Sequence, residues 1–346
     1  MDFQYNVFMS NWSKTVPKAV LHDHLDGGLR VSTLIELANK QNYSNLPSTN
    51  TEDLLEWIQP KPNMTLALNL EAWDHTIAVM QDTESIYRVT MEALEDLSND
   101  GVIYSELRFA PLVHCQKGLN PTEVVDAVLH GIKDGESDFN ITAGAILCAM
   151  RHLKNSKEVI NLCVENSDIF AFDLAGPEIG FSALNHKEAL EIAHENSVKV
   201  TLHADWEVPE GIHEVVLDLK AHRIGHGSQI IDDIIIDNGN LHFKSDAARY
   251  VFENNIALEL CPTSNMQCGS CESISEHPFK KLYDAGFNVT INTDNRLMSN
   301  TTMSEEVQNL VDAFDFSENQ IRKITSNTIK AGFVNEAKKN ELLENF

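Results

Sequence analysis

Residues 169–178 read Ile-Phe-Ala-Phe-Asp-Leu-Ala-Gly-Pro-Glu, a short apolar run that ends in polar residues and in the turn formers Gly176 and Pro177. A run without regular polar alternation is typical of a strand buried on both faces, as in a parallel sheet. The polar residues lie at the carboxyl end of the expected strand. The stretch therefore predicts one strand-and-turn unit of a parallel α/β fold.

Seven further apolar runs of this kind are spread along nearly the whole chain. Between them, residues 121–132, 187–196 and 212–220 have the apolar spacing of helices. Eight strands that alternate with helices predict a closed (β/α)8 barrel of the TIM type. The eight expected strands are 19–22, 103–109, 142–148, 169–174, 198–202, 223–224 with its flanks, 256–260 and 288–291.

A helical insert is expected at about residues 51–99, between the first and second strands, because Leu, Trp and Met recur there at helical spacing. Two interpretations stay open: an extra helical layer packed on the barrel, or a lid that closes over substrate. The sequence contains no internal repeat and no convincing linker. We therefore expect one domain over residues 1–346.

The chain is strongly acidic, with 26 Lys and Arg against 52 Asp and Glu and a formal net charge of −26. Such a surface repels nucleic-acid phosphates and anionic lipids, so we expect neither as a partner. Residues 1–18 lack the pattern of a leader peptide, and no apolar run is long enough to span a bilayer. Together with six scattered cysteines, this pattern indicates a cytoplasmic protein with reduced thiols.

Polar residues follow five of the eight expected strands. In a barrel of this type the carboxyl ends of all strands meet at one face, which is where active sites of the fold lie. We therefore expect these polar residues to form one site. The segments are His22-Asp23-His24, Asp173 to Glu178, His203-Ala204-Asp205, Gly225-His226-Gly227 and Asn292 to Asn295.

Four of these residues make a plausible metal site. His22 and His24 are two positions apart at one strand end, and His203 and Asp294 follow other strands. Three imidazole nitrogens and one carboxylate oxygen suit zinc and leave a coordination position open for water. The sequence therefore predicts one Zn²⁺ per chain, with iron and cobalt as alternatives.

The other histidines and the Cys268–Cys271 pair carry weaker signals. A single C-x-x-C without a second one is interpreted as an ordinary loop. His114 and His152 follow the second and third strands, so a contact with the site is an open possibility. The remaining histidines are expected at helical, loop or surface positions: His75, His130, His186, His194, His213, His222, His242 and His277.

Five ordered motifs resemble the adenosine deaminase family of the amidohydrolase superfamily. The resemblance runs from Pro17 to beyond Met303, and residues 292–299 look most like the actinobacterial type of bacterial member. The motifs are Pro-Lys-x-x-Leu-His-x-His-Leu-Asp-Gly at 17–27, Asp-Leu-Ala-Gly-x-Glu at 173–178, Ile-Gly-His-Gly at 224–227, Cys-Pro-Thr-Ser-Asn at 261–265 and Asn-Thr-Asp at 292–294.

The resemblance implies a role for each site residue. It implies that zinc is bound by His22, His24, His203 and Asp294. It also implies that His226 and Asp294 act on the attacking water and that His24 contacts the substrate as well. The nucleoside contacts that it implies are Asp26 with the ribose, the backbone N–H of Gly176 with a purine ring nitrogen, and Asn295 with N7 of the base.

One departure from the family pattern concerns the general acid. The family usually has Glu three residues after the histidine, whereas this chain reads His203-Ala204-Asp205-Trp206-Glu207. We expect a local bulge to carry Glu207 into the place of the acid. Asp205 remains the alternative, because an indole N–H such as that of Trp206 cannot deliver a proton at useful rates.

These expectations combine into one function, the zinc-dependent hydrolytic deamination of adenosine, with 2′-deoxyadenosine as a second substrate, to a 6-oxopurine nucleoside and ammonia. Two alternatives stay open. The substrate could be a related 6-aminopurine, either a 5′-substituted adenosine or adenine, or the barrel could bind a purine without catalysis. The sequence gives no oligomeric state.

Overall fold

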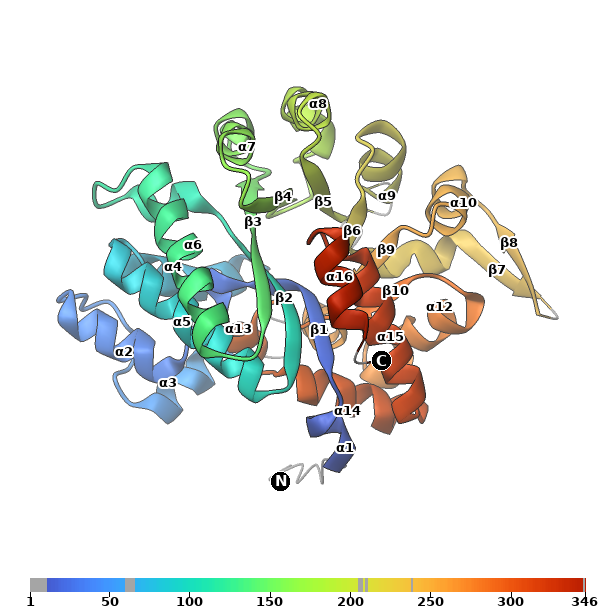
Figure 1. Ribbon diagram of the computed structural model, residues 1–346, viewed down its shortest axis with the longest axis horizontal. Coiled ribbons are helices and arrows are strands. Elements are labelled where there is room, and N and C mark those ends of the chain that lie inside the picture. Colours follow the sequence, from blue (N-terminus) through green and yellow to red (C-terminus); the bar gives the residue numbers. More distant parts are fainter. Residues whose placement is uncertain (1–10, 60–65, 205–207, 209–210, 238, 345) are drawn as a thin grey trace.

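Eight parallel strands form the centre of the computed structural model, which describes residues 11–59, 66–204, 208, 211–237, 239–344 and 346. Each strand pairs with its neighbour in the order β1-β2-β3-β4-β5-β6-β9-β10, so all eight expected strands are confirmed (Figure 1). Their bounds are β1 Lys18–His24, β2 Val102–Phe109, β3 Thr142–Met150, β4 Ile169–Ala175, β5 Lys199–Ala204, β6 Arg223–His226, β9 Ala257–Leu260 and β10 Val289–Ile291.

The barrel closes where β1 meets the segment after β10. Asp23 and Asp294 form a parallel bridge, and the His24 N–H donates to the Asp294 carbonyl at 2.7 Å. In return, the Asp294 N–H donates to the His22 carbonyl at 3.0 Å. The side chain of Asn292 adds to this seam, because its Oδ1 accepts the His22 N–H at 3.1 Å. The seam joins the two ends of the strand order and makes the sheet a nearly closed, TIM-like barrel.

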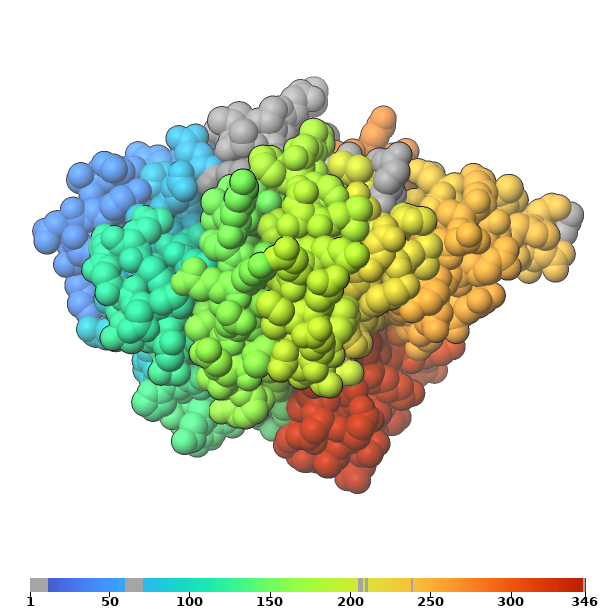
Figure 2. All heavy atoms as spheres, turned by 90° about the horizontal axis from the view of Figure 1, so that it is seen from above, coloured from blue at the N-terminus to red at the C-terminus, as the bar shows by residue number. Residues whose placement is uncertain are grey.

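Helices surround the strands on the outside, in the order of the chain. Figure 2 shows α7, α8 and the segment after them side by side on the outer surface, in green and yellow. In the described parts of the chain, no helix is both long and apolar enough to cross a membrane. The helices after β2 are α6 Pro121–Asp138, α7 Ser156–Glu165, α8 Lys187–Glu195, α9 Gly211–His213, α10 Asp246–Glu253, α11 Pro262–Gln267, α12 Phe279–Ala285, α13 Arg296–Ser299, α14 Met303–Phe314, α15 Glu318–Ala331 and α16 Glu336–Leu343.

The start of α6 illustrates how the sequence sets these helices. Asn120 caps the helix by accepting the backbone N–H of Glu123, and the Glu123 side chain accepts the N–H of Asn120 in return. Pro121 occupies the first helical position, where no N–H donor is needed. The helix then buries Val124 and Val128 toward the barrel. The expected helix at 212–220 is shorter, with α9 passing into a π-helical turn at Glu214–Asp218.

The expected insert between the first and second strands is helical. It contains α3 Thr51–Ile58, α4 Leu66–Val79 and α5 Thr83–Asn99, and α2 Val31–Lys40 precedes them. Helix α5 packs against β2 and α6 as part of the outer ring, whereas α2 and α3 lie at the edge of the molecule (Figure 1). Helix α4 contacts the short 3-10 turns Leu25–Gly27 and Pro111–Cys115, which follow β1 and β2, and so borders the carboxyl ends of the strands.

A β-hairpin between β6 and β9 was not predicted from the sequence. Strands β7 Ile234–Asp237 and β8 Asn240–Phe243 pair antiparallel and project from the side of the molecule (Figures 1 and 2). Ile234 is buried, but Ile235 and Ile236 are about half exposed. The run of β-branched residues was a signal for a strand, but it lies within the connection between two barrel strands.

Candidate active site

The four expected metal ligands meet at the carboxyl end of the barrel. His22 and His24 lie on β1, His203 on β5, and Asp294 directly after β10. All four are buried, and one possible ligand atom from each lies within 4.8 Å of the others. Side chains separated by most of the chain therefore form one compact group that can hold a metal ion.

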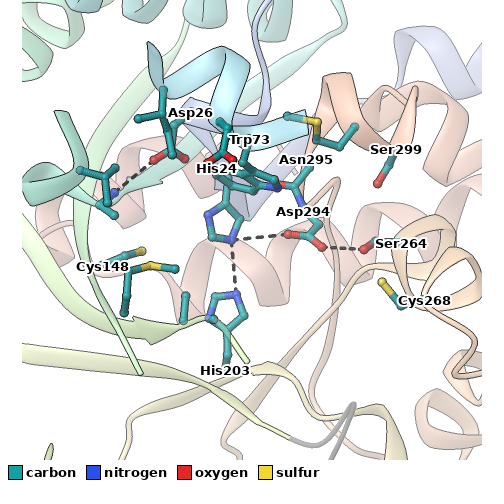
Figure 3. Close-up of a pocket in the computed structure, with 18 of the residues that line it drawn as sticks. His24, Asp26, Trp73, Cys148, His203, Ser264, Cys268, Asp294, Asn295 and Ser299 are labelled. Carbon is teal, nitrogen blue, oxygen red and sulfur yellow. Dashed lines mark hydrogen bonds and ion pairs between the residues drawn. The ribbon is translucent and has the colours of Figure 1, made fainter. Parts of the chain in front are cut away.

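The atoms at the centre of this group face one another. His24 Nε2 lies 3.3 Å from His203 Nε2 and 3.5 Å from Asp294 Oδ1 (Figure 3). His22 Nε2 lies 3.4 Å from the same oxygen and, among the described residues, has no hydrogen-bond partner. The pairing of β1 with β2 shifts register between Val20 and Asp23, which bends the strand as expected for the two histidines to share a centre.

Carboxylates on the far side of the rings fix two of the histidines. His22 Nδ1 lies 3.1 Å from Glu259 Oε2, and His203 Nδ1 lies 3.0 Å from Asp173 Oδ2. A ring N–H that donates to a carboxylate leaves the lone pair of Nε2 directed at the centre. This pattern, together with the buried and unpartnered His22 Nε2, fits a zinc ion at the centre.

The electrostatics of the group also suit a metal. Burial holds the pKa of His24 well below its usual value and lowers the pKa of His203 as well, so both rings are neutral near pH 7. For Asp294, burial alone would raise the pKa, but the His22 ring, whose Nε2 lies 3.4 Å from Oδ1, holds it well below the usual range. For His22, burial and the charge of Arg108 lower the pKa, but the contacts with Asp294 and Glu259 outweigh them and raise it, so a metal ion competes with a proton for this ring. Neutral His24 and His203 and an ionised Asp294 are in the protonation states that zinc binding requires.

A second possible ligand group overlaps the first, since His226, Cys261 and Asp294 also have ligand atoms within 4.8 Å of one another. The Cys261 thiol donates to the backbone carbonyl of Glu259, and burial raises its pKa well above the usual value. A protonated thiol is a poor zinc ligand. The three histidines with Asp294 are therefore the better site.

His226, at the end of β6, is held in one tautomer. Asn265 Oδ1 accepts the backbone N–H of Cys261 at 3.3 Å and faces His277 Nε2 at 3.1 Å, so its Nδ2 must be the atom that donates to His226 Nδ1 at 3.2 Å. Because Nδ1 accepts, the proton of the neutral ring sits on Nε2. Burial lowers the pKa of His226 to about 3, so the ring remains a neutral N–H donor. His277 lies in a loop, as expected, but it is buried and not at the surface.

A cavity of about 360 Å³ opens beside the metal group. His24, His203, His226 and Asp294 line one side of it, and the 3-10 turn after β1, helix α4 and the segments after β4 and β10 line the other. The described residues that line this cavity include no lysine and no arginine. The residues that line the cavity also include Asp26, Trp73, Gly176, Asn295 and, after α11, Cys268, the first residue of the C-x-x-C pair.

Asp26 uses only one of its two carboxylate oxygens within the protein. Oδ2 accepts the backbone N–H of Ala110 at 3.2 Å (Figure 3). It also lies 3.4 Å from His114 Nε2. Oδ1 is buried without a hydrogen-bond partner in the part of the chain that the structure describes. His114 is therefore in contact with a site residue, and His152 lines the same cavity.

Asn295 and Gly176 are the other expected nucleoside contacts. Asn295 Oδ1 is also buried with no hydrogen-bond partner among the residues described. Gly176 has a φ of +94°, and a Cβ there would lie 3.2 Å from the Met150 Cε atom. The left-handed backbone and this close approach both favour glycine, which leaves the backbone of Gly176 bare at the wall of the cavity.

The candidates for the general acid cannot be placed. Asp205, Trp206 and Glu207 lie outside the described residues. The last described residue before them, Ala204 at the end of β5, follows His203 directly. Glu207 and its alternative Asp205 therefore remain sequence predictions.

Sequence reasoning missed several residues that support the site. Glu259 lies within β9 and Arg108 within β2, and both side chains are fully buried. A charged residue inside an otherwise apolar run was the available signal, because a buried charge needs a partner. Asn265 lies in a motif quoted for the family resemblance, but its contact with His226 requires the fold.

Comparison with known proteins assigns the family. The family model described as adenosine deaminase matches residues 17–346. The adenosine deaminase of Mycobacterium leprae is 42% identical over 331 residues, which cover 93% of this chain and 91% of that protein. The chain belongs to the adenosine deaminase family. This confirms the family and the actinobacterial likeness that the sequence motifs predicted.

Solved structures of other proteins have a similar barrel. The N6-mAMP deaminase of Arabidopsis superimposes with a TM-score of 0.83 at 26% identity, covering 97% of this chain and 98% of that one. An amidohydrolase of Burkholderia ambifaria with bound Zn has a TM-score of 0.83 at 21% identity, covering 96% and 90%. The second likeness concerns the fold alone.

Proposed function

We propose that this chain hydrolyses adenosine, and 2′-deoxyadenosine, to inosine or 2′-deoxyinosine and ammonia with one zinc ion. The observation that carries the proposal is the buried group of His22, His24, His203 and Asp294 at the wall of a cavity large enough for a nucleoside. Relatives above 40% identity that are named adenosine deaminase support the choice of substrate.

The metal is proposed to be held by His22, His24, His203 and Asp294, with Glu259 and Asp173 orienting two of the rings. Zinc in such a site supplies a Lewis acid that lowers the pKa of a coordinated water to near neutrality. The expected cofactor is supported by the neutral imidazoles of His24 and His203 and by the buried, compact set of four ligands.

The two residues beside the attacking water are assigned different tasks. Asp294 is the proposed acceptor of a proton from the water, because it lies beside the metal group and Ser264 occupies only its Oδ2, at 2.6 Å. His226 is a hydrogen-bond donor at Nε2 and stabilises charge on the oxygen that attacks C6, since its Nδ1 already accepts from Asn265. Protonation of N1 is assigned to Glu207, with Asp205 as the alternative, and ammonia leaves from the tetrahedral carbon.

The cavity favours a nucleoside over a nucleotide. Among its described lining residues, the charged side chains are carboxylates, which repel a phosphate, and lysine and arginine are absent. The solved Arabidopsis relatives named for nucleotides or bound to IMP and GMP therefore differ from this chain in the ligand proposed here.

The cavity also favours a nucleoside over free adenine. Asp26 Oδ1 is a buried acceptor without a partner in the described structure, and a ribose hydroxyl can donate to it. Adenine alone would leave this oxygen unpaired.

The buried thiols of Cys148, Cys163 and Cys261 support the further proposal of a reducing, cytoplasmic location.

The test is a substrate panel of adenosine, 2′-deoxyadenosine, adenine, AMP and a 5′-substituted adenosine, followed by absorbance and by ammonia release. We expect the highest kcat/KM for the two nucleosides, with one ammonia released per inosine formed. Equal efficiency on adenine or AMP would contradict the substrate assignment. Binding of adenosine without ammonia release from zinc-loaded protein would favour the non-catalytic alternative.

A further inference from the structure

A layer of buried charges lies inside the barrel, beneath the metal group. It consists of three carboxylates and two guanidinium groups, all fully or almost fully buried, and in the remainder of this section it is called the charge layer. Burial of unpaired charges is costly, so each member must be compensated by its neighbours. Its members are Glu106, Arg108, Asp173, Arg223 and Glu259.

Arg108 makes the contacts that connect this layer to the metal group. One terminal nitrogen donates to Asp173 Oδ2 at 3.0 Å, and the other donates to Glu259 Oε2 at 2.7 Å. The second nitrogen also donates to the backbone carbonyl of Leu21 at 2.6 Å, next to His22 in the chain. One planar group therefore holds strands β1, β4 and β9 at fixed distances.

The carboxylates that Arg108 contacts are the ones that face the histidines. His203 Nδ1 lies 3.0 Å from Asp173 Oδ2 and 3.1 Å from Asp173 Oδ1, and His22 Nδ1 lies 3.1 Å from Glu259 Oε2. Arg108 is thus one carboxylate away from two metal ligands on different strands. A continuous chain of contacts therefore runs from His22 through Glu259, Arg108 and Asp173 to His203.

We propose that Arg108 is a positioning residue for the metal centre: it fixes His22 and His203 relative to each other by holding the two carboxylates that orient them. The inference rests on the metal site of the proposed function. A guanidinium is suited to this task because its donors form a rigid fork, so the spacing and angle of two carboxylates are set together. A lysine is a point charge and lacks this geometry.

Arg223 provides a matched control within the same layer. It is equally buried and also pairs with two carboxylates, donating to Glu259 Oε1 at 2.7 Å and to Glu106 Oε2 at 2.5 Å. However, it contacts the Glu259 oxygen that faces away from His22, and its second partner, Glu106, is not paired with any of the four ligands. Loss of Arg223 should therefore disturb packing and charge balance without releasing the ligand pair.

The test compares Arg108→Lys with Arg223→Lys in the full chain. For each variant, zinc affinity is measured by competition with a chelator, and thermal stability is measured on the metal-free protein. We expect Arg108→Lys to weaken zinc binding about 10–100-fold, the range found when groups that orient metal ligands are changed. Arg223→Lys should lower the melting temperature comparably and change zinc affinity by less than about threefold. Equal loss of affinity in both variants, or none in Arg108→Lys, would overturn the proposal.

A spectroscopic readout separates ligand geometry from stability. The visible spectrum of the Co²⁺-substituted protein depends on the coordination geometry of the ion. We expect its bands to shift in Arg108→Lys and to stay unchanged in Arg223→Lys. An unchanged spectrum in Arg108→Lys would contradict a positioning role.

If Arg108→Lys does not fold, a double-mutant cycle tests whether Asp173 and Glu259 act on zinc binding together. Asp173→Asn and Glu259→Gln are combined, and zinc affinity is measured for the two single variants and the double variant. Because one guanidinium holds both carboxylates, the double variant should lose less affinity than the product of the two single losses. Independent losses would overturn the proposal. Zinc binding is measured without adenosine, so a protein that binds zinc but does not deaminate adenosine would refute only the proposed function.

Discussion

The two sides of the cavity differ in how far the protein itself satisfies their polar groups. On the metal side, Glu259 and Asp173 hold His22 and His203, and Ser264 donates to Asp294. The ligand atoms of the metal group, which face one another, remain available to a metal ion. The protein itself therefore orients His22, His203 and Asp294 and leaves free the atoms that face the ion.

On the nucleoside side, an acceptor remains unused. Asp26 Oδ1 is buried and has no hydrogen-bond partner within the described residues. A buried acceptor without a partner is costly, and a ligand that donates to it recovers that cost. The comparison indicates that the metal side is rigid before substrate arrives, whereas the nucleoside side is completed by the substrate. Variants on the two sides should therefore fail in different ways.

The largest effect is expected on the metal side. His203→Ala and Asp294→Ala each remove a proposed ligand, so bound zinc and nearly all turnover should be lost. Metal analysis of the purified variants together with an ammonia-release assay checks this. Stoichiometric zinc and a normal rate in both variants would refute the ligand assignment.

His226→Ala sharpens the comparison, because His226 faces the metal group without being one of its four members. Zinc should stay bound while kcat falls about 10²–10⁴-fold, as expected when a positioned donor is removed. Asn265→Asp should cause part of the same loss, since a carboxylate would accept from His226 Nδ1 and leave Nε2 without its proton. Zinc content and kcat are the measurements, and a normal kcat in His226→Ala would contradict the role of His226.

Glu207→Gln tests the general acid that the sequence predicts. A general acid typically raises the rate of a reaction about 10²–10⁴-fold, so Glu207→Gln should lower kcat by about that factor while zinc remains bound. Asp205→Asn is the matched control. A loss confined to Asp205→Asn would assign the acid to Asp205, and normal rates in both variants would mean that N1 is protonated by another group.

The smallest effect is expected on the nucleoside side, for Asp26→Ala. Removing the proposed ribose contact should lower kcat/KM for adenosine about 10–100-fold, in line with loss of one buried hydrogen bond to a charged group. The rate on adenine should change little, so the preference for adenosine narrows. Zinc content must remain at one ion per chain. Loss of zinc in Asp26→Ala would break the comparison, because it would join the two sides into one unit.

The barrel was predictable because its signal is local and repeated. Each of the eight runs is short and apolar, and their polar ends point to one face, so the site could be assembled from the sequence before any coordinates. Even β6, Arg223–His226, was found despite its length of four residues. The hairpin β7–β8 was missed because it is an addition within a connection and does not alter the strand count.

The parts of the site that could not be predicted depend on contacts between distant residues. Arg108 and Glu259 are separated by 151 positions, and no local pattern says that they meet beneath the metal group. The roles of Gly176 and Asn295 came only from the family resemblance. His277 illustrates the same limit, because its position next to Asn265 is set by the packing of the segment before α12 and not by its own neighbours in sequence.

The seam that closes the barrel has a consequence for how the chain is made. The backbone pairs that join β1 to the segment after β10 connect residues about 270 positions apart, and they involve His22, His24 and Asp294 themselves. During synthesis on the ribosome, His22 and His24 therefore emerge long before Asp294. One edge of β1 stays unpaired until the segment after β10 has been synthesised. Metal capture and ring closure belong to the same late event, so nascent chains that stop before residue 288 should retain neither.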